Sequence, residues 1–183
     1  MSGHRRGFTL IEMMVAIAII GLMLGLSLGA GKALLPQERL KSSANDLAGT
    51  LLQMRTDAIS RRMEIIFTYD LTENRYKAHL PYELDDEGHI LGPGESPVRD
   101  WRELEEGMAF GSIYFADGSA REDGLVALRI TPLGRIPPHD VVVYNPDYPE
   151  TELFTIRVSG LSLASEIVDG FVQPEIIEDA HFR

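Results

Sequence analysis

The chain has 183 residues, 44% of them hydrophobic, which allows one membrane segment and one modest packed domain but not two full domains. It contains no cysteine, so disulfides and thiolate metal sites are excluded. The formal net charge is −11, and beyond residue 35 the balance falls to −13. Such an acidic exterior disfavours contact with a phosphate backbone, so no nucleic-acid partner is expected.

The first predicted element is a long apolar helix behind a short basic leader. Arg5 and Arg6 stand in the leader, and the nineteen residues 13–31 carry no charge. At about 1.5 Å per residue such a helix is roughly 28 Å long, close to the roughly 30 Å hydrocarbon core of a bilayer. The pattern therefore predicts a transmembrane helix over residues 8–35. Glu12 is the exception, because a carboxylate within an apolar segment is costly in lipid and usually marks function.

Residues 7–12, Gly-Phe-Thr-Leu-Ile-Glu, resemble the prepilin signature of type IV pilins and type II secretion pseudopilins. In that family a membrane-embedded prepilin peptidase cuts after the glycine and methylates the new amino terminus. The resemblance implies a leader over residues 1–7, cleavage between Gly7 and Phe8, N-methylation of Phe8, and a role for Glu12 in subunit assembly. A neighbouring subunit's terminal amine can neutralise that carboxylate as a filament grows.

The resemblance also implies the location of the protein. It places a single-pass anchor in the inner membrane and the C-terminal domain in the periplasm, within a pseudopilus. Charge counting by itself does not decide the orientation, because Lys32, Arg39 and Lys41 follow the apolar segment as closely as the basic leader precedes it.

Two other interpretations of the N-terminal segment stay open. A secretory signal peptide would use the same basic leader and be cut near residues 27–30, releasing a secreted β-domain that acts as an enzyme or a binder. Glu12 inside the apolar region argues against this interpretation. A simple membrane anchor is the second alternative.

Three glycines within the apolar segment recur at every fourth residue, namely Gly21, Gly25 and Gly29. Small residues at this spacing line one face and let helices approach closely in a membrane. They are therefore candidates for helix packing between subunits. The alternative is that glycine is simply common in membrane spans.

A second, amphipathic helix is expected over residues 36–62. Pro36 lacks the amide proton for one helical bond, so an interruption or kink is expected there. Beyond it apolar residues follow at spacings of 4, 3, 4, 3 and 4, namely Leu40, Ala44, Leu47, Leu51, Met54 and Ala58. Such a stripe usually packs on its own domain, with a coiled-coil partner as the alternative.

Beyond residue 62 the pattern changes to short strands separated by turn residues, which indicates a mostly antiparallel β-sheet domain over residues 63–172. A hairpin is expected from segments 64–69 and 75–80. An acidic segment rich in glycine and proline, residues 83–106, is expected to be a surface loop. Later strands are expected over 109–116, 125–131, 140–144, 153–158 and 163–168. The acidic tail, residues 173–183, is expected to be frayed.

No catalytic constellation stands out. The five histidines are scattered without a pair at metal-ligand spacing, and no nucleophile-elbow motif is present. Asp85, Asp86 and Glu87 could attract calcium, but the spacing of a dedicated calcium loop is missing. The sequence therefore predicts a protein that is not an enzyme and that has no metal, cofactor or small-molecule substrate.

Motifs beyond the first helix narrow the resemblance. Residues 54–59 (Met-Arg-Thr-Asp-Ala-Ile), 114–119 (Tyr-Phe-Ala-Asp-Gly-Ser), 131–135 (Thr-Pro-Leu-Gly-Arg) and 158–160 (Val-Ser-Gly) are similar to the GspH/FimT domain of H-type minor pseudopilins. The resemblance implies an α+β, pilin-like fold in which a long N-terminal helix packs on a mostly antiparallel β-sheet domain.

The function that this resemblance implies is structural. It is that of a minor pseudopilin, a subunit of the type II secretion pseudopilus that takes part in protein export. The implied partners are the prepilin peptidase and other major and minor pseudopilins. A minor pilin of a type IV pilus is the alternative within the family.

Overall fold

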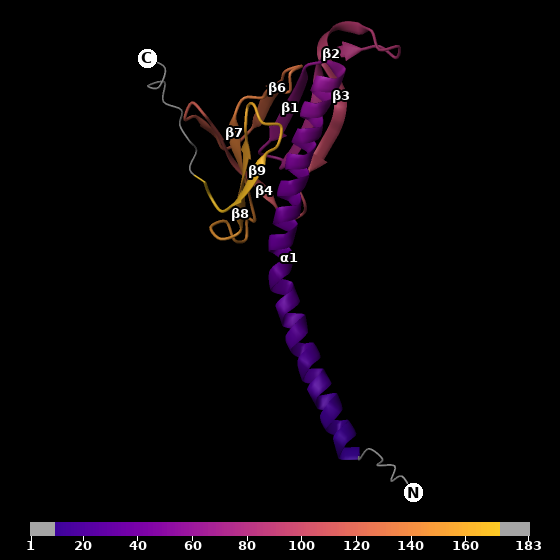
Figure 1. The fold of residues 1–183 in the computed structure, drawn as a ribbon, viewed down its shortest axis with the longest axis vertical. Coiled ribbons are helices and arrows are strands. Elements are labelled where there is room, and N and C mark those ends of the chain that lie inside the picture. Colours follow the sequence, from indigo (N-terminus) through magenta and orange to yellow (C-terminus); the bar gives the residue numbers. More distant parts are fainter. Residues whose placement is uncertain (1–9, 173–183) are drawn as a thin grey trace, which may run out of the picture. The chain divides into compact units, whose positions relative to one another are not determined.

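The computed structural model describes residues 10–172, with the side chains of residues 24–37 outside the description. The chain divides into two compact units, Met1–Glu38 and Arg39–Arg183, and each is described by itself. Helix α1, Leu10–Arg61, contributes residues to both units. Nine strands, all in the second unit, complete the described part of the fold (Figure 1).

The expected interruption at Pro36 is not found, because α1 is one helix that includes this residue. A proline inside a helix removes one backbone hydrogen bond and costs about 3 kcal/mol. Leucine, alanine, lysine, glutamine and glutamate, which are strong helix formers, surround it in the sequence. The helix therefore continues past the proline.

The predicted apolar stripe of α1 is confirmed as the helical contribution to the core of the second unit. Its members are at most 1% exposed: Leu40, Ala44, Leu47, Leu51, Met54 and Ala58. Burying one leucine side chain contributes about 1.5–3 kcal/mol. The stripe therefore holds residues 39–61 against their own β-domain, as the period of the sequence predicted.

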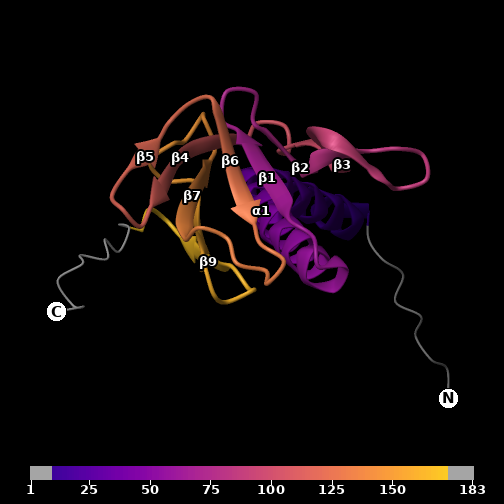
Figure 2. The same ribbon diagram turned by 90° about the horizontal axis from the view of Figure 1, so that it is seen from above.

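The strands form two antiparallel sheets. The first has the order β3-β2-β1-β6 and contains β1 (Ile65–Asp70), β2 (Arg75–Leu84), β3 (Ile90–Glu103) and β6 (Leu125–Ile130). The second has the order β5-β4-β7-β8-β9 and contains β4 (Ala109–Phe115), β5 (Ala120–Arg121), β7 (His139–Tyr144), β8 (Leu153–Val158) and β9 (Glu166–Asp169). Figure 2 shows α1 next to β1 and β2, with the second sheet to one side.

Most predicted strands are found within a residue or two of their expected bounds. The hairpin of β1 and β2 is present, with Phe67 opposite Ala78 and Tyr69 opposite Tyr76. The final strand begins at Glu166, three residues later than expected. The short strand β5 was not anticipated.

Residues 83–106 lie at the surface as expected, but the expectation of a loop is wrong. β2 extends to Leu84, and β3 fills Ile90–Glu103 as the edge strand beside it. An edge strand tolerates proline because one side of its backbone needs no sheet partner, and four register shifts accommodate the irregular sequence. Cross-strand contacts hold the pair, with Lys77 Nζ 2.6 Å from Glu95 Oε2 and the guanidinium of Arg75 4.5 Å from the ring centre of Trp101.

The inner face of the first sheet supplies the aromatic part of the core. Phe67, Tyr69 and Tyr76 are each at most 1% exposed. The ring of Phe67 lies 5.0 Å from that of Tyr69 and 5.7 Å from that of Tyr76. Aromatic pairs at these separations add about 0.5–1.5 kcal/mol beyond their buried area. Tyr69 also contacts Phe110 of the second sheet, which joins the two sheets into one core.

Candidate functional site

The first candidate site is the N-terminal part of α1. The helix begins at Leu10, so Glu12 lies in its first turn. Unpaired amide groups and the helix dipole make a carboxylate favourable there by about 0.3–1 kcal/mol. The helix N-terminus therefore stabilises the Glu12 carboxylate, whereas transfer of the carboxylate into lipid is unfavourable.

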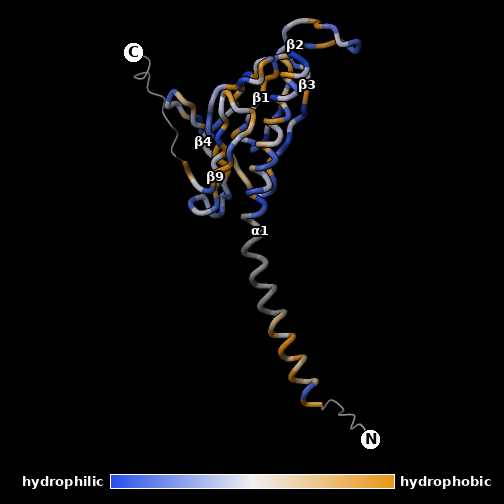
Figure 3. The backbone as a smooth tube through the Cα atoms, viewed as in Figure 1, coloured by the Kyte–Doolittle hydropathy of each residue, from blue (hydrophilic) through white to orange (hydrophobic). Residues whose placement is uncertain are grey.

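The other side chains of this part of α1, residues 10–23, are mostly apolar and are exposed around the whole helix. Leu10 and Ile11 are 79% and 69% exposed, and every described residue from 10 to 23 falls in the exposed class. Figure 3 shows this part of α1 as mostly hydrophobic, whereas hydrophobic and hydrophilic residues alternate along the second unit. A helix that is apolar on all sides is typical of one that is buried by other molecules.

Among the residues that the structure describes, none of the helices reaches the combined length and apolarity required for a span.

The predicted site residues are placed only in part. Gly7 and Phe8 lie outside the described residues, and Gly25 and Gly29 lie in α1 where the surroundings of the chain are not described. Gly21 is described, and a Cβ atom added to it would meet no heavy atom within 4 Å. Nine residues separate Gly21 from Glu12, which at about 100° per residue places them on opposite faces of the helix. The carboxylate and the glycine face can therefore contact different neighbours.

The second candidate is a buried arginine of α1 in the second unit, to which the sequence had assigned no role. Arg55 is fully buried, and its Nε donates to the carbonyl of Gly134 at 2.7 Å. Its Nη1 donates to the carbonyl of Ser159 at 3.0 Å, and longer contacts reach Leu163 and Gly160. No carboxylate pairs with Arg55 among the described residues, and burial lowers the pKa of this guanidinium from its usual value.

Three of the quoted sequence motifs meet at this arginine. Arg55 belongs to residues 54–59, Gly134 to residues 131–135, and Ser159 to residues 158–160. Gly134 takes a positive φ of 72°, which favours glycine and lets its carbonyl turn toward the guanidinium. Arg55 therefore fastens α1 to two loops that are 79 and 104 residues away in sequence.

A buried tyrosine–histidine pair lies between the two sheets. The carbonyl of Pro137 can only accept, so His139 Nδ1 donates to it at 2.7 Å. His139 Nε2 then accepts from the hydroxyl of Tyr69 at 3.0 Å. Burial lowers the pKa of His139 to about 4, so the ring is neutral at pH 7. Both ring nitrogens of His139 have a hydrogen-bond partner, so the pair is satisfied within the core.

A third polar group joins α1 to the first sheet. Asp46 accepts from the hydroxyl of Tyr76 at 2.8 Å and lies 2.9 Å from Arg102 Nη2. Burial, together with the hydrogen bond to Asp46, raises the pKa of Tyr76 to about 12. The hydroxyl therefore stays protonated and holds the carboxylate in place.

The turn between β2 and β3 brings together three possible metal ligands: Asp85 and Glu87, which the sequence had suggested, and His89, which it had not. Donor atoms of Asp85, Glu87 and His89 lie within 4.8 Å of one another. Asp85 Oδ1 accepts from the backbone of Glu87 and His89, and Oδ2 lies 3.1 Å from His89 Nδ1. The hydrogen bond from the His89 backbone is the main reason why the pKa of Asp85 is lowered. These bonds account for the grouping without an ion.

Comparison with known proteins bears on both the N-terminal segment and the fold. The family described as the prokaryotic N-terminal methylation motif matches residues 3–28, which include Gly7, Phe8 and Glu12. None of the curated proteins compared with the chain matches it.

Two solved structures of the minor pseudopilin EpsH from the type 2 secretion system of Vibrio cholerae have a similar fold. One is 14% identical with a TM-score of 0.50, and the match covers 72% of this chain and 97% of that one. The other is 12% identical with a TM-score of 0.55, covering 74% and 99%. The likeness shows the fold, which is an N-terminal helix packed on an antiparallel β-sheet domain as in EpsH.

Proposed function

We propose that this chain is a minor pseudopilin, a structural subunit of a type II secretion pseudopilus that takes part in protein export. The observation that carries the proposal is the combination of the methylation motif over residues 3–28 with a C-terminal unit that folds like EpsH. The motif by itself also suits a minor type IV pilin. The fold likeness favours the pseudopilin.

The proposal assigns a role to each predicted residue at the N-terminus. Prepilin peptidase cuts between Gly7 and Phe8 and methylates Phe8. Glu12 then lies four residues from the new terminus, about 6 Å along a helix. Its carboxylate pairs with the terminal amine of a neighbouring subunit, so that two opposite charges lie together in apolar surroundings.

The remaining parts of α1 anchor and pack the subunit. Residues 8–35 form the single-pass anchor in the inner membrane, and the apolar side chains exposed from Leu10 onward face lipid or other pseudopilin helices. Gly21, Gly25 and Gly29 let those helices approach closely. The second unit lies in the periplasm and primes or caps the pseudopilus without catalysing a reaction.

Processing gives the decisive test. Replacing Gly7 by valine leaves a full-length precursor in the membrane, because the peptidase of this family accepts little besides glycine before the cut. Gly3→Val in the same leader is the matched control and matures normally. Intact mass spectrometry measures both, and wild type loses residues 1–7 and gains one methyl group.

Two results would contradict the proposal. A mature mass that is unchanged by Gly7→Val would remove the peptidase from the pathway. A wild-type mass that lacks residues up to about 29 would show signal-peptidase cleavage and a released β-domain instead.

A further inference from the structure

The first sheet ends in two edge strands of very different character, β3 and β6, which lie at its opposite ends (Figure 2). β6 forms six consecutive pairs with β1 without a register shift, and it contains neither proline nor glycine. Its one charged residue is Arg129, whose Nε lies 3.3 Å from Glu64 Oε1 beside the start of β1. A regular, mostly apolar edge strand of this kind is a template for pairing with another strand.

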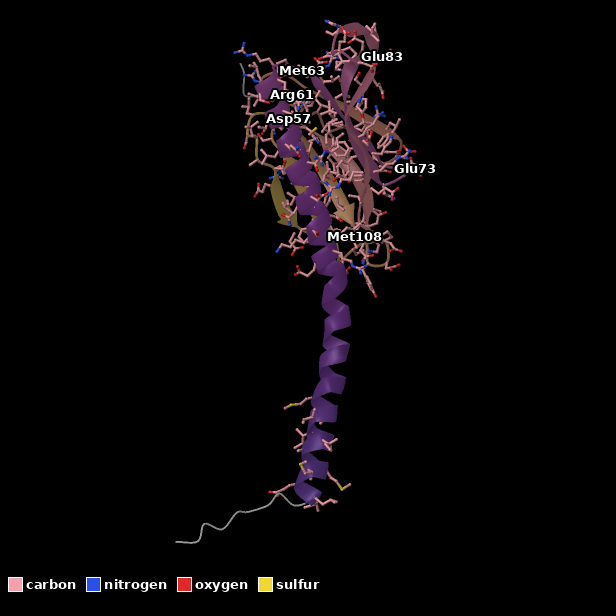
Figure 4. The ribbon with its side chains drawn as sticks, turned by 90° about the vertical axis from the view of Figure 1, so that its right-hand side faces the viewer. Asp57, Arg61, Met63, Glu73, Glu83 and Met108 are labelled. Atoms are coloured by element: carbon pink, nitrogen blue, oxygen red, sulfur yellow. The ribbon has the colours of Figure 1, made fainter. Side chains whose placement is uncertain are left out.

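The other three edge strands each have a feature that discourages such pairing. β3 contains Pro93 and Pro97 and pairs with β2 through four register shifts. The side chain of Glu83, labelled in Figure 4, lies against Gly94 of β3 so closely that a Cβ atom there would clash, which adds to the irregularity of this edge. In the second sheet, β5 has two residues, and β9 has four with an acidic residue at each end. Prolines, bulges, charges and shortness are the usual protection of sheet edges, so β6 is the exception among the described strands.

The backbone of β6 leaves alternate residues without a hydrogen-bond partner. Leu71 N donates to the carbonyl of Gly124 at 3.0 Å, one pair beyond the end of the β1–β6 ladder. Because bonded and non-bonded pairs alternate in an antiparallel ladder, the N–H and C=O groups of Leu125, Ala127 and Arg129 point away from β1. Among the described residues, no backbone hydrogen bond outside the ladders reaches these three. Buried backbone groups are nearly always paired, so this edge is open to water.

The side chains of β6 also suit an added strand. Leu125, Ala127 and Arg129 are exposed on the outer face of the sheet, Leu125 by 66%. Val126 and Leu128 face the core, and each remains 7% exposed. A strand laid along the free edge places its side chains alternately beside these two rows. Apolar side chains fit both rows, because they cover Leu125 on one face and extend the core on the other.

We propose that β6 receives an extended segment of a different protein, which adds a fifth strand to the four-stranded first sheet. The partner is recognised by its main chain, through hydrogen bonds to Leu125, Ala127 and Arg129, and by apolar side chains beside Leu125 and Val126. Its paired stretch contains no proline, since alternate amides must donate. That the partner is not a second copy pairing through its own β6 rests on the proposed function, in which this subunit is a minor one. The surface itself does not depend on processing at Gly7.

Residue-resolved amide hydrogen exchange of the full-length chain in detergent tests the pairing. The probe is a synthetic peptide of alternating valine and threonine, joined through a Gly/Ser linker and a disulfide to Asp123→Cys, which is then the only cysteine of the chain. The tether gives a local concentration in the millimolar range, so that a weakly binding probe suffices. We expect exchange at Leu125, Ala127 and Arg129 to slow about tenfold or more. Exchange in β5, which ends two residues before the tether, should stay unchanged.

Two variants separate strand addition from docking of side chains alone. Ala127→Pro removes one outward N–H group but no bond to β1, so the slowing at Leu125 and Arg129 should be lost. Ala127→Val keeps this N–H group and is the matched control, and melting temperatures show whether both variants fold. If the proline variant does not fold, a probe N-methylated at every residue makes the same comparison on the unchanged protein, because it cannot donate to the free carbonyls of β6.

Three results would overturn the proposal. The first is unchanged exchange at the three edge amides with the unmodified probe. The second is equal slowing with the N-methylated probe, which would show a contact through side chains alone. The third is slowing that rises with protein concentration and needs no probe, because it would show two copies pairing through β6. None of these results depends on the mass of the mature chain, which tests the proposed function separately.

Discussion

Removing the buried guanidinium of Arg55 tests how the second unit is held together. Arg55→Met keeps a long unbranched side chain in the same space but deletes the donors to Gly134 and Ser159. A hydrogen bond from a charged group contributes about 1.5–3 kcal/mol, so the two short bonds together are worth roughly 3–6 kcal/mol. The contacts at 3.4 and 3.5 Å add little.

The opposing term is the cost of burying the Arg55 charge, which no carboxylate of the described residues neutralises. Methionine relieves this desolvation, but it leaves two loop carbonyls without their donor, at about 1–3 kcal/mol each if they stay dry. We expect the lost bonds to prevail and Arg55→Met to destabilise the unit by about 3 kcal/mol. For a unit of this size the melting temperature then falls by roughly 6–12 °C.

The assay is thermal and urea unfolding of the full chain in detergent, together with amide hydrogen exchange. Exchange should quicken in residues 131–135 and 159–165, because these loops lose their fastening to α1. Arg135→Met is the control in the same loop; its side chain is exposed, so we expect a change below about 0.5 kcal/mol. A methionine variant as stable as wild type would refute the reasoning and show that desolvation cancels the bonds.

Three further predictions concern the membrane segment, the core histidine and the edge strand. The Glu12→Leu variant should insert and mature normally, because the substitution removes a carboxylate that is costly in lipid. It should nevertheless fail to crosslink to partner subunits. Glu38→Gln in the same helix is the control. The pKa of His139 is about 4 in the folded chain and about 6.5 in the unfolded chain, so the unfolded chain binds the proton more tightly. The contribution of the neutral ring to stability is therefore complete above pH 6.5 and is lost as the pH falls to 4. Urea titration across this range should show a loss of up to about 3 kcal/mol that His139→Gln removes. Replacing residues 90–103 by a short Gly/Ser linker should cost about 3 kcal/mol or more, because β3 covers part of the core.

Each of these predictions has a contrary result. Equal crosslinking yields for Glu12→Leu and wild type would remove Glu12 from assembly. A pH profile that is the same with and without His139, while the exposed His89→Gln changes it, would place the titration elsewhere. An unchanged melting temperature after loss of β3 would mean that the segment behaves as the solvated loop that its composition suggested.

Local sequence determined the parts of this protein that depend on near neighbours. The spacing of Leu40, Leu47 and Leu51 specified which face of α1 is buried, since a helix repeats every 3.6 residues and the core needs one apolar stripe. The segments that became β1, β4 and β8 were readable because β-branched and aromatic residues stand between turn residues. The N-terminal motif was readable because its six residues are consecutive.

Tertiary structure decided the rest. β3 reads as a loop because its prolines, glycines and acidic residues suit no isolated strand, and only pairing with β2 makes it one. Residues 54–59, 131–135 and 158–160 were visible as separate motifs, but their meeting at Arg55 depends on hydrogen bonds between residues 79 and 104 positions apart. The periodicity of a helix or strand does not indicate which residues meet when they are so far apart in the sequence. The neutral state of His139 likewise arises from burial between two sheets, which no stretch of the sequence contains by itself.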